Sequence, residues 1–315
     1  AKTVLEPIFE AGFSPVSFGF RPKRSAHQAL EAVRVAANRG LVWVLDADIE
    51  ACFDSIDHDR LIELIGRRVV DRRMLKLVRG WLRKGMLGGG VVPGSGTGTP
   101  QGSPLSPLLA NIALNVLDEV WEREGGRLGT LVRYSDDFVV LAPTRERAVA
   151  ARELAAVTLA GLGLRLHPQK TRIVCLRDGG EGFDFLGFHH RMVESRKWPG
   201  RWYLHKWPSR RAMNTIRGRV RELTDRRYAS LDIGMVIERV NQTLRGWGGY
   251  YQYGNSSRQF AAVDQYVHLR VARLASVKHG LAGRNWTSRF SYRWLIRQGV
   301  HRLTGTVTYW AVVHA

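Results

Sequence analysis

The sequence predicts an α+β protein in two parts, a mixed α/β part over residues 1–190 and an α-helical part over residues 191–315. Apolar runs of strand length, such as LVWVLDADI and FVVLA, alternate with helical segments in the first part. Beyond residue 208 the apolar residues recur at helical spacing. The charge changes as well, because residues 191–315 hold 23 Lys and Arg against 6 Asp and Glu, whereas the first part holds 25 against 22.

Helical periodicity and turn residues place the individual elements. In the first part we expect helices over residues 3–11, 26–38, 58–83, 106–123 and 146–162. In the second part we expect helices over residues 208–224, 232–246, 258–278 and 286–297. Ser25 can cap the helix at 26–38, and Gly40 can end it. Strands are expected in LVWVLDADI, in the two β runs of LVRYSDDFVVLAP, at the end of LRLHPQKTRIVCL and in GFDFLGFHHRMV.

Aromatic side chains are concentrated in the basic second part, which holds seven of the ten Trp and eight of the nine Tyr. Basic residues interleaved with aromatic ones suit a phosphate backbone and stacked bases, so we expect a nucleic-acid partner. The alternative is a solvated basic surface or one that binds acidic proteins. No run approaches 18 apolar residues, so no membrane span is expected. Two cysteines cannot supply a disulfide framework or a zinc site unaided.

Three aspartates are the strongest candidates for chemistry. Asp48 closes the run VWVLDADI, and Asp136 and Asp137 are adjacent between the β runs LVR and FVVLA. Neighbouring carboxylates repel each other, and a divalent cation removes that cost. Three acids on neighbouring strand ends can hold two metal ions about 3.5–4 Å apart, the arrangement used for in-line phosphoryl transfer. The alternative is that Asp136 and Asp137 form a solvated hairpin turn.

Six blocks stand in order along the chain, and two of them contain these aspartates: FSPVSFGFRPKRSAHQAL, DADIEACFDSIDH, GTPQGSPLSPLLANIALNVLDE, RYSDDFVVLA, LGLRLHPQKTRIV and FDFLGF. Together they resemble the reverse transcriptases of group II introns. GWGGYYQYGNSSRQFAAVDQYVHLRV is similar to the maturase (thumb) segment of that family. The resemblance implies a right-hand polymerase fold. Residues 1–190 would form partial fingers and the palm, an antiparallel sheet with packed helices, and residues 191–315 would form an α-helical thumb or maturase domain that binds RNA.

The resemblance also implies an activity. The chain would be an RNA-directed DNA polymerase, a nucleotidyltransferase that extends a primer 3′-OH with dNTPs by two-metal phosphoryl transfer. Its cofactors would be two Mg²⁺ ions, with Mn²⁺ as a substitute. Its partners would be an RNA template or intron RNA and a DNA primer or target, and it would assist intron splicing and mobility in the bacterial cytoplasm, associated with the nucleoid or a ribonucleoprotein. Two alternatives stay open: a catalytically silent splicing maturase, and a related polymerase recruited to CRISPR or phage defence.

The family's metal-binding residues match Asp48, Asp136 and Asp137, which the main-chain carbonyl of Ile49 commonly joins. Phe53 matches the steric gate that excludes a ribose 2′-OH, and its alternative is a core aromatic. Arg21 matches an arginine near template and nucleotide, and Gln101 with Gly102 matches a loop that touches the incoming nucleotide. Lys170 matches a lysine near the triphosphate. The primer grip of the family matches Phe185, Leu186, Gly187 and Phe188.

Each of these further matches has a plainer alternative. Arg21 could be an ordinary surface arginine, the Gln101–Gly102 pair an ordinary turn before a helix, and Lys170 a solvated turn lysine. The sequence also departs from the family pattern. The match begins after the family's first fingers block, and no Cys/His cluster of an endonuclease domain follows residue 300, which is typical of the compact class. Ser135 replaces the alanine most common at its position.

Overall fold

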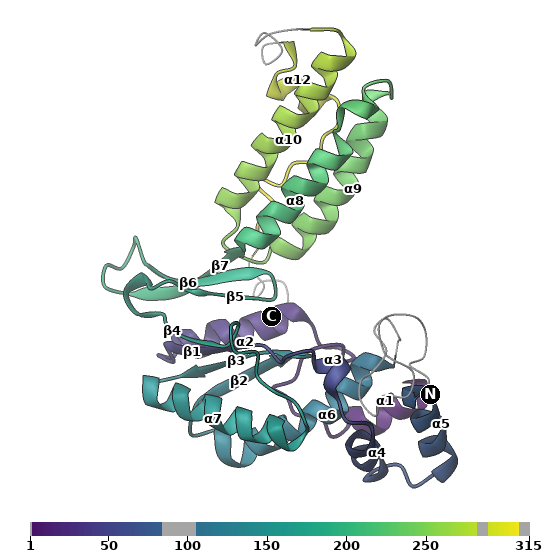
Figure 1. Ribbon diagram of the computed structural model, residues 1–315. Coiled ribbons are helices and arrows are strands. Elements are labelled where there is room, and N and C mark those ends of the chain that lie inside the picture. The colour runs from purple at the N-terminus through teal and green to yellow at the C-terminus, as the bar shows by residue number, and fades with distance from the viewer. Residues whose placement is uncertain (1, 84–104, 282–288, 309–315) are drawn as a thin grey trace. The chain divides into compact units, whose positions relative to one another are not determined.

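The computed structural model describes residues 2–83, 105–281 and 289–308 (Figure 1). The chain forms two compact units. The first comprises residues 1–185 and 192–204, and the second comprises residues 186–191 and 205–315. The α+β fold class expected from the sequence is confirmed, since the first unit contains an antiparallel sheet with packed helices and the second is mainly helical.

A four-stranded sheet forms the centre of the first unit, in the order β2-β3-β1-β4. The strands are β1 (Trp43–Ala47), β2 (Thr130–Tyr134), β3 (Asp137–Ala142) and β4 (Arg172–Cys175). Each neighbouring pair is antiparallel. Residues 138–142 of β3 are buried without alternation, because helices cover both faces of the sheet. Figure 1 shows α2 (Ala26–Asn38) on one face and α7 (Arg145–Gly161) on the other.

The remaining α-helices of the first unit are α1 (Lys2–Glu10), α3 (Cys52–Ser55), α4 (His58–Gly66), α5 (Arg72–Arg83) and α6 (Ser106–Val120), which continues into a π-helical turn, η1 (Trp121–Gly125). Helices α1, α3 and α4 contact α6, and α5 contacts α4. The predicted cap of α2 is confirmed, because Ser25 and Gln28 form a reciprocal capping box. The single helical stretch expected over residues 58–83 is wrong. The chain breaks after Gly66, and Asp71 starts the second helix by accepting a hydrogen bond from the amide of Arg73 (2.8 Å).

A second sheet contains three strands in the order β5-β6-β7: β5 (Phe183–Phe185), β6 (Phe188–Glu194) and β7 (Trp202–Pro208). Strand β7 was not expected from the sequence. Its inward positions are Leu204, Lys206 and Pro208, so a lysine interrupts the apolar alternation that would have indicated a strand. The ammonium of Lys206 lies 5.8 Å from the ring centroid of Phe188, which explains how a buried position accepts a cation.

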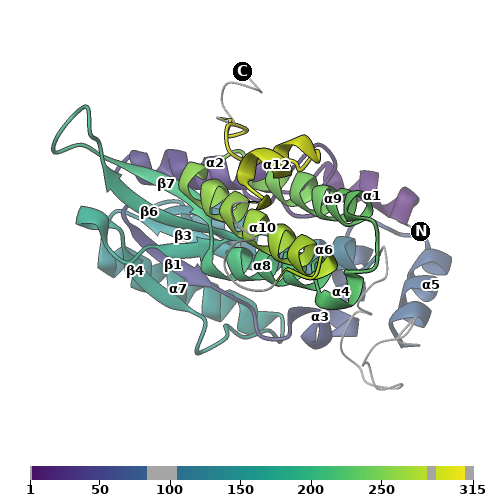
Figure 2. The same cartoon turned by 90° about the horizontal axis from the view of Figure 1, so that it is seen from above.

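Helices dominate the second unit (Figure 2). They are α8 (Arg210–Leu223), the short η3 (Arg226–Tyr228), α9 (Ile233–Tyr251), α10 (Ser257–Lys278) and α12 (Tyr292–Arg297). α8, α9 and α10 contact one another pairwise, which makes a three-helix bundle. Within the described ranges, no helix has the length and apolar character needed to cross a membrane.

Candidate active site

The three candidate aspartates lie at one end of the four-stranded sheet. Ala47 of β1 is opposite Phe138 of β3. Because the two strands are antiparallel, Asp48, which follows Ala47, lies beside Asp137, which precedes Phe138. Tyr134 of β2 is opposite Asp137, which leaves Ser135 and Asp136 as a two-residue turn. The strand register therefore brings together carboxylates that are far apart in the sequence.

The turn between β2 and β3 has an unusual backbone. Ser135 has φ +59°, in the left-handed region that glycine adopts most easily. Positive φ at the first turn position is typical of type II′ hairpins, whose twist matches that of the flanking strands. The Oγ of Ser135 is buried and makes no hydrogen bond with any described residue. The turn thus combines backbone strain with an unsatisfied hydroxyl, and such features cluster at functional sites.

Electrostatic repulsion marks this end of the sheet. The pKa of Asp137 is raised to about 6, first by desolvation and then by the charges of Asp136 and Asp48. Asp137 as a whole is exposed to solvent, so the repulsion by Asp136 and Asp48 outweighs the desolvation. The pKa of Asp46 is also raised to about 6, chiefly by burial, although Arg172 bonds to it (3.2 Å). Added positive charge would stabilise this group of carboxylates.

Lys170 supplies part of that charge. Its Nζ donates to Oδ2 of Asp48 at 2.6 Å, and the main-chain carbonyl of Asp48 accepts a hydrogen bond from the amide of His167 (2.8 Å). The side chain of Lys170 is exposed, so the ammonium can leave Asp48 at low cost. Lys170 therefore lies beside the carboxylates.

The donor set at this edge fits a hard divalent cation, because carboxylate oxygens are the protein ligands that Mg²⁺ prefers. Among the described residues, however, no three His, Cys, Asp or Glu side chains are already arranged as a metal site. The amine of Lys170 takes up one carboxylate oxygen of Asp48. Metal binding by Asp48, Asp136 and Asp137 stays a prediction.

Ile49 and Phe53 follow Asp48 in the sequence. Phe53 lies on the short helix α3, which starts after Ala51 in a left-handed conformation (φ +42°). Its ring is partly buried against the main core of the unit, and Ile49 is buried in that core. Packing against the core is consistent with the core-aromatic alternative, and the steric-gate role of Phe53 stays a prediction.

Gln101 and Gly102, the predicted nucleotide-contacting pair, lie outside the described residues.

Arg21 is buried, which excludes the surface-arginine alternative, and its role near template and nucleotide stays a prediction. Its side chain is only 5% exposed. Its guanidinium forms an ion pair with Glu10 (2.8 Å) and donates to the main-chain carbonyls of Phe13, Ser14 and Ser17. All its N–H donors are used within the protein, so a phosphate contact would require these bonds to break. In this structure Arg21 holds the loop that precedes α2.

The segment Phe185–Phe188 forms the tight turn between β5 and β6. Leu186 and Gly187 both have positive φ (+49° and +78°), as in type I′ hairpins. Within the second unit, the carbonyl of Leu186 accepts from the hydroxyl of Tyr250 (2.9 Å), and the ring of Phe188 lies 4.8 Å from that of Tyr251. These contacts fix the turn, and its role as a primer grip stays a prediction.

Sequence reasoning missed three buried polar residues behind the aspartates. Arg133 and Asp118 are fully buried, and Asn111 is 1% exposed. A signal was available: Arg133 interrupts the buried run of β2, and Asn111 and Asp118 are seven positions apart on the apolar helix α6, which places them on one face. Polar residues at core positions imply mutual hydrogen bonds.

Comparison with known proteins gives two family matches. Residues 1–190 match the model of reverse transcriptases (RNA-dependent DNA polymerases), and residues 213–294 match the group II intron maturase-specific domain. The protein YkfC of Escherichia coli is 33% identical over an alignment 229 residues long that covers 61% of this chain and 58% of YkfC. The group II intron-encoded protein LtrA of Lactococcus lactis is 44% identical over 118 residues, which are 38% of this chain and 20% of LtrA.

The chain thus spans less than two thirds of either relative. The solved telomerase of Candida albicans, in complex with a fragment of telomeric RNA, aligns with 94% of this chain and 55% of its own, with 11% identity and a TM-score of 0.48. The family match over residues 1–190 covers more than half of the chain and includes Asp48, Asp136 and Asp137. The chain therefore belongs to the reverse transcriptase family and carries a group II intron maturase-specific domain.

Proposed function

We propose that this protein is an RNA-directed DNA polymerase of the group II intron type, which extends a primer 3′-OH with dNTPs on an RNA template. The observation that carries the proposal is the meeting of Asp48, Asp136 and Asp137 at one sheet end, within the segment that matches the reverse transcriptase family. The raised pKa of Asp137 supports it, because carboxylates crowded in this way are suited to bind cations.

The chain's own groups have distinct tasks in this reaction. Asp48, Asp136 and Asp137 would hold two Mg²⁺ ions, which lower the pKa of the attacking hydroxyl and stabilise the leaving oxygen. Lys170 would exchange its bond to Asp48 for one to a phosphate oxygen of the nucleotide. There its ammonium can donate a proton to the leaving pyrophosphate. Phe53, five positions after Asp48, would lie under the sugar of the nucleotide.

Removal of divalent metal tests the proposal directly. A labelled DNA primer annealed to an RNA template should be extended in the presence of dNTPs and Mg²⁺. An excess of chelator should abolish extension, and Mg²⁺ added back should restore it, because the aspartates cannot activate the hydroxyl alone. Mn²⁺ should substitute for Mg²⁺. Extension that persists in chelator, or no extension with either metal, would contradict the proposal.

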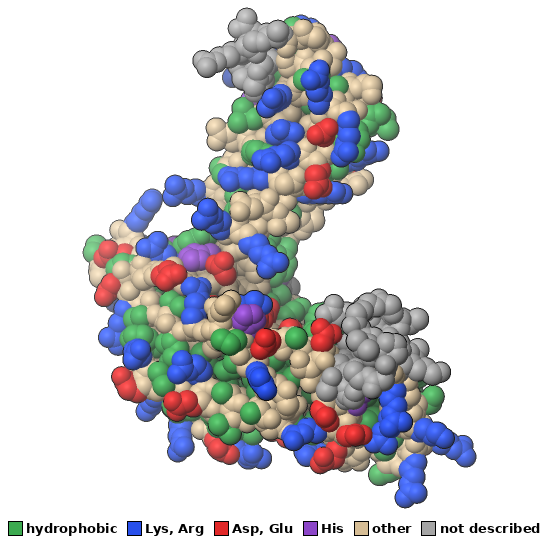
Figure 3. Space-filling model, viewed as in Figure 1, with side chains coloured by type: hydrophobic (Ala, Val, Ile, Leu, Met, Phe, Trp, Pro, Cys, Tyr) green, Lys and Arg blue, Asp and Glu red, His purple; other side chains and the backbone are tan. Residues whose placement is uncertain are grey.

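We further propose that the second unit binds RNA as a splicing maturase does. On the face that Figure 3 shows, Lys and Arg side chains are spread over this unit with few acids between them. A cavity of about 390 Å³ between α8, η3 and α9 is lined by Arg219, Arg227, Tyr228, Arg239 and Gln242, among others. Arginines around an aromatic ring and an amide suit a phosphate and its base.

Arg239 offers a specific test of this RNA site. Its side chain is exposed and makes no hydrogen bond or ion pair with any described residue, so its charge is available to a phosphate. Arg239→Gln should weaken RNA binding and reduce the slope of log affinity against log salt by about 0.7–0.9, the contribution of one phosphate contact. Fluorescence anisotropy at several salt concentrations measures both quantities.

Arg297→Gln is the matched control, because Arg297 is also exposed but lies on α12 and is not one of the residues that line the cavity. It should change the salt slope by clearly less than Arg239→Gln. Equal slopes for the two variants would show that the cavity is not a preferred contact and that the second unit attracts RNA only by its overall charge.

A further inference from the structure

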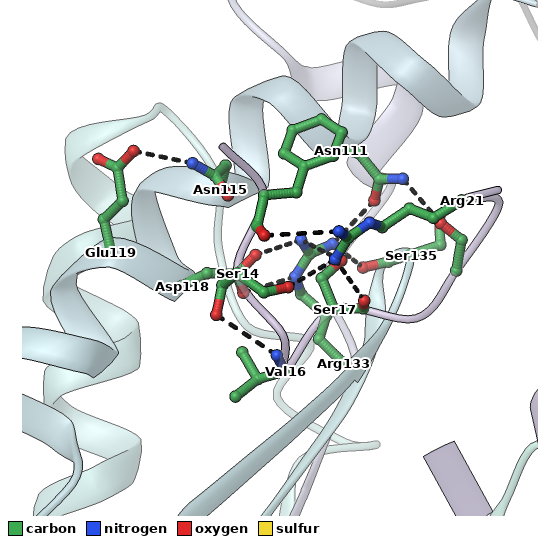
Figure 4. Close-up of polar contacts among 12 residues, drawn as sticks. Ser14, Val16, Ser17, Arg21, Asn111, Asn115, Asp118, Glu119, Arg133 and Ser135 are labelled. Carbon is green, nitrogen blue, oxygen red and sulfur yellow. Dashed lines mark hydrogen bonds and ion pairs between the residues drawn. The ribbon is translucent and has the colours of Figure 1, made fainter. Parts of the chain in front are cut away.

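A buried arginine lies directly behind the aspartate turn. Arg133 ends the buried part of β2, two positions before Ser135, and its side chain is fully buried. Its Nε donates to Oδ1 of Asp118 (2.8 Å) and its Nη2 to Oδ2 of the same carboxylate (2.5 Å), so the two groups form a bidentate ion pair (Figure 4). This pair ties β2 to α6.

The other donors of Arg133 reach the turn and the loop before α2. Nη1 donates to the main-chain carbonyl of Ser135 (2.9 Å) and to Oδ1 of Asn111 (3.0 Å). Nη2 also donates to Oγ of Ser17 (2.8 Å). All five N–H groups of the guanidinium are therefore used. The bond to Ser135 matters most, because that carbonyl belongs to the peptide that joins Ser135 to Asp136.

The loop over residues 16–20 supports the turn from the other side. Its main chain pairs with β2, since Arg133 N donates to Val16 O (2.9 Å) and Phe18 N donates to Arg133 O (2.9 Å). The side chain of Asn111 donates to the carbonyl of Gly19 (2.7 Å). Arg21 donates to the carbonyl of Ser17 in the same loop and to that of Ser14 just before it, so two buried arginines hold this segment.

Gly19 touches the backbone of the turn itself. A methyl group built on Gly19 would lie 2.9 Å from the carbonyl carbon of Tyr134 and closer still to the amide nitrogen of Ser135. Main-chain atoms cannot move aside as the end of a flexible side chain can. Gly19 has no positive φ, so what the position requires is the absence of a side chain and not a special conformation.

We propose that Arg133 and Gly19 are positioning residues of the aspartate turn: Arg133 holds the Ser135 carbonyl from within, and Gly19 lets the loop over residues 16–20 press against the turn. The proposal rests on the proposed function of Asp136 and Asp137 as metal ligands. The strain at Ser135 favours a turn that relaxes, and the two supports oppose that movement.

Gly19→Ala tests the proposal with the smallest change. The added methyl should displace the turn, and a misplacement of about 1 Å at a catalytic site can cost about 100-fold in rate. We expect primer extension to fall about 100-fold in kcat, with a higher Mn²⁺ dissociation constant measured by electron paramagnetic resonance of the free ion. Amide hydrogen exchange of peptides that cover residues 131–138 should become faster, while RNA affinity stays unchanged.

Gly161→Ala is the matched control, because a methyl group at Gly161 meets nothing within 4 Å. This variant should keep the wild-type extension rate, Mn²⁺ affinity and hydrogen exchange. Wild-type Mn²⁺ affinity and exchange in Gly19→Ala would overturn the proposal, as would a loss of activity matched only by a smaller folded fraction. If the wild-type protein neither extends primers nor binds Mn²⁺, the proposed function fails, and the exchange at residues 131–138 still decides whether Gly19 holds the turn.

Discussion

Replacement of Arg133 by methionine should lower the free energy of unfolding by about 3–5 kcal/mol, the usual cost of breaking a buried ion pair by removing one partner. Methionine fills similar space but leaves the fully buried carboxylate of Asp118 without its cation. It also leaves Asn111, Ser17 and the Ser135 carbonyl without their donor. Urea unfolding followed by circular dichroism should show the first unit melting at a much lower urea concentration.

Two variants separate this effect from a general loss of charge. Arg79→Met removes an exposed arginine that pairs with Asp59 (3.3 Å), and it should change stability by less than about 1 kcal/mol. Arg133→Met combined with Asp118→Leu removes both buried charges and should recover part of the lost stability. A single Arg133→Met variant as stable as Arg79→Met would show that the ion pair does not hold the first unit together.

Simultaneous replacement of Asp136 and Asp137 by alanine should reduce primer extension by about 1,000-fold or more. The loss of one preorganised electrostatic group can already cost about 100–1,000-fold, and here two metal ligands are lost. The fold should not suffer. The pKa of Asp137 is raised above its unfolded value, so its ionised form opposes folding as the pH rises through about 6. The double variant should therefore be at least as stable as the wild type at pH 7.

Asp59→Ala is the control for this prediction, because Asp59 is an exposed carboxylate on α4 with an 85% exposed side chain. Its rate of primer extension should match that of the wild type. If the Asp136→Ala, Asp137→Ala protein extended primers at the wild-type rate, the assignment of the metal site would be wrong. If it were inactive but also unfolded at pH 7, the expectation that removal of the Asp137 charge does not destabilise the fold would be wrong.

Local signals in the sequence predicted most of the elements. Ser25 caps α2 as expected, and the two β runs on either side of Asp136 and Asp137 predicted the β2–β3 hairpin. The break between α4 and α5 was missed, because the apolar spacing continues through it and only the capping by Asp71 marks it. Strand β7 was missed because Lys206 occupies an inward position.

The contacts behind the site could not be predicted for a different reason. The bond between Lys170 and Asp48 joins residues 122 positions apart, and Asn111 reaches Gly19 across 92 positions. No spacing rule links such residues, since their meeting depends on the strand order of the sheet. Arg21 shows the same limit: its motif gave no sign of its burial, which depends on Glu10 and on the loop carbonyls.

The bond between Ser17 and Arg133 also has a consequence for how the chain is made. Ser17 leaves the ribosome 116 residues before its partner. At about 5–20 residues per second, the nascent segment around Phe18 waits roughly 6–23 s before β2 exists to receive it. During that time its aromatic side chains stay uncovered, and co-translational chaperones are the natural binders of such a segment.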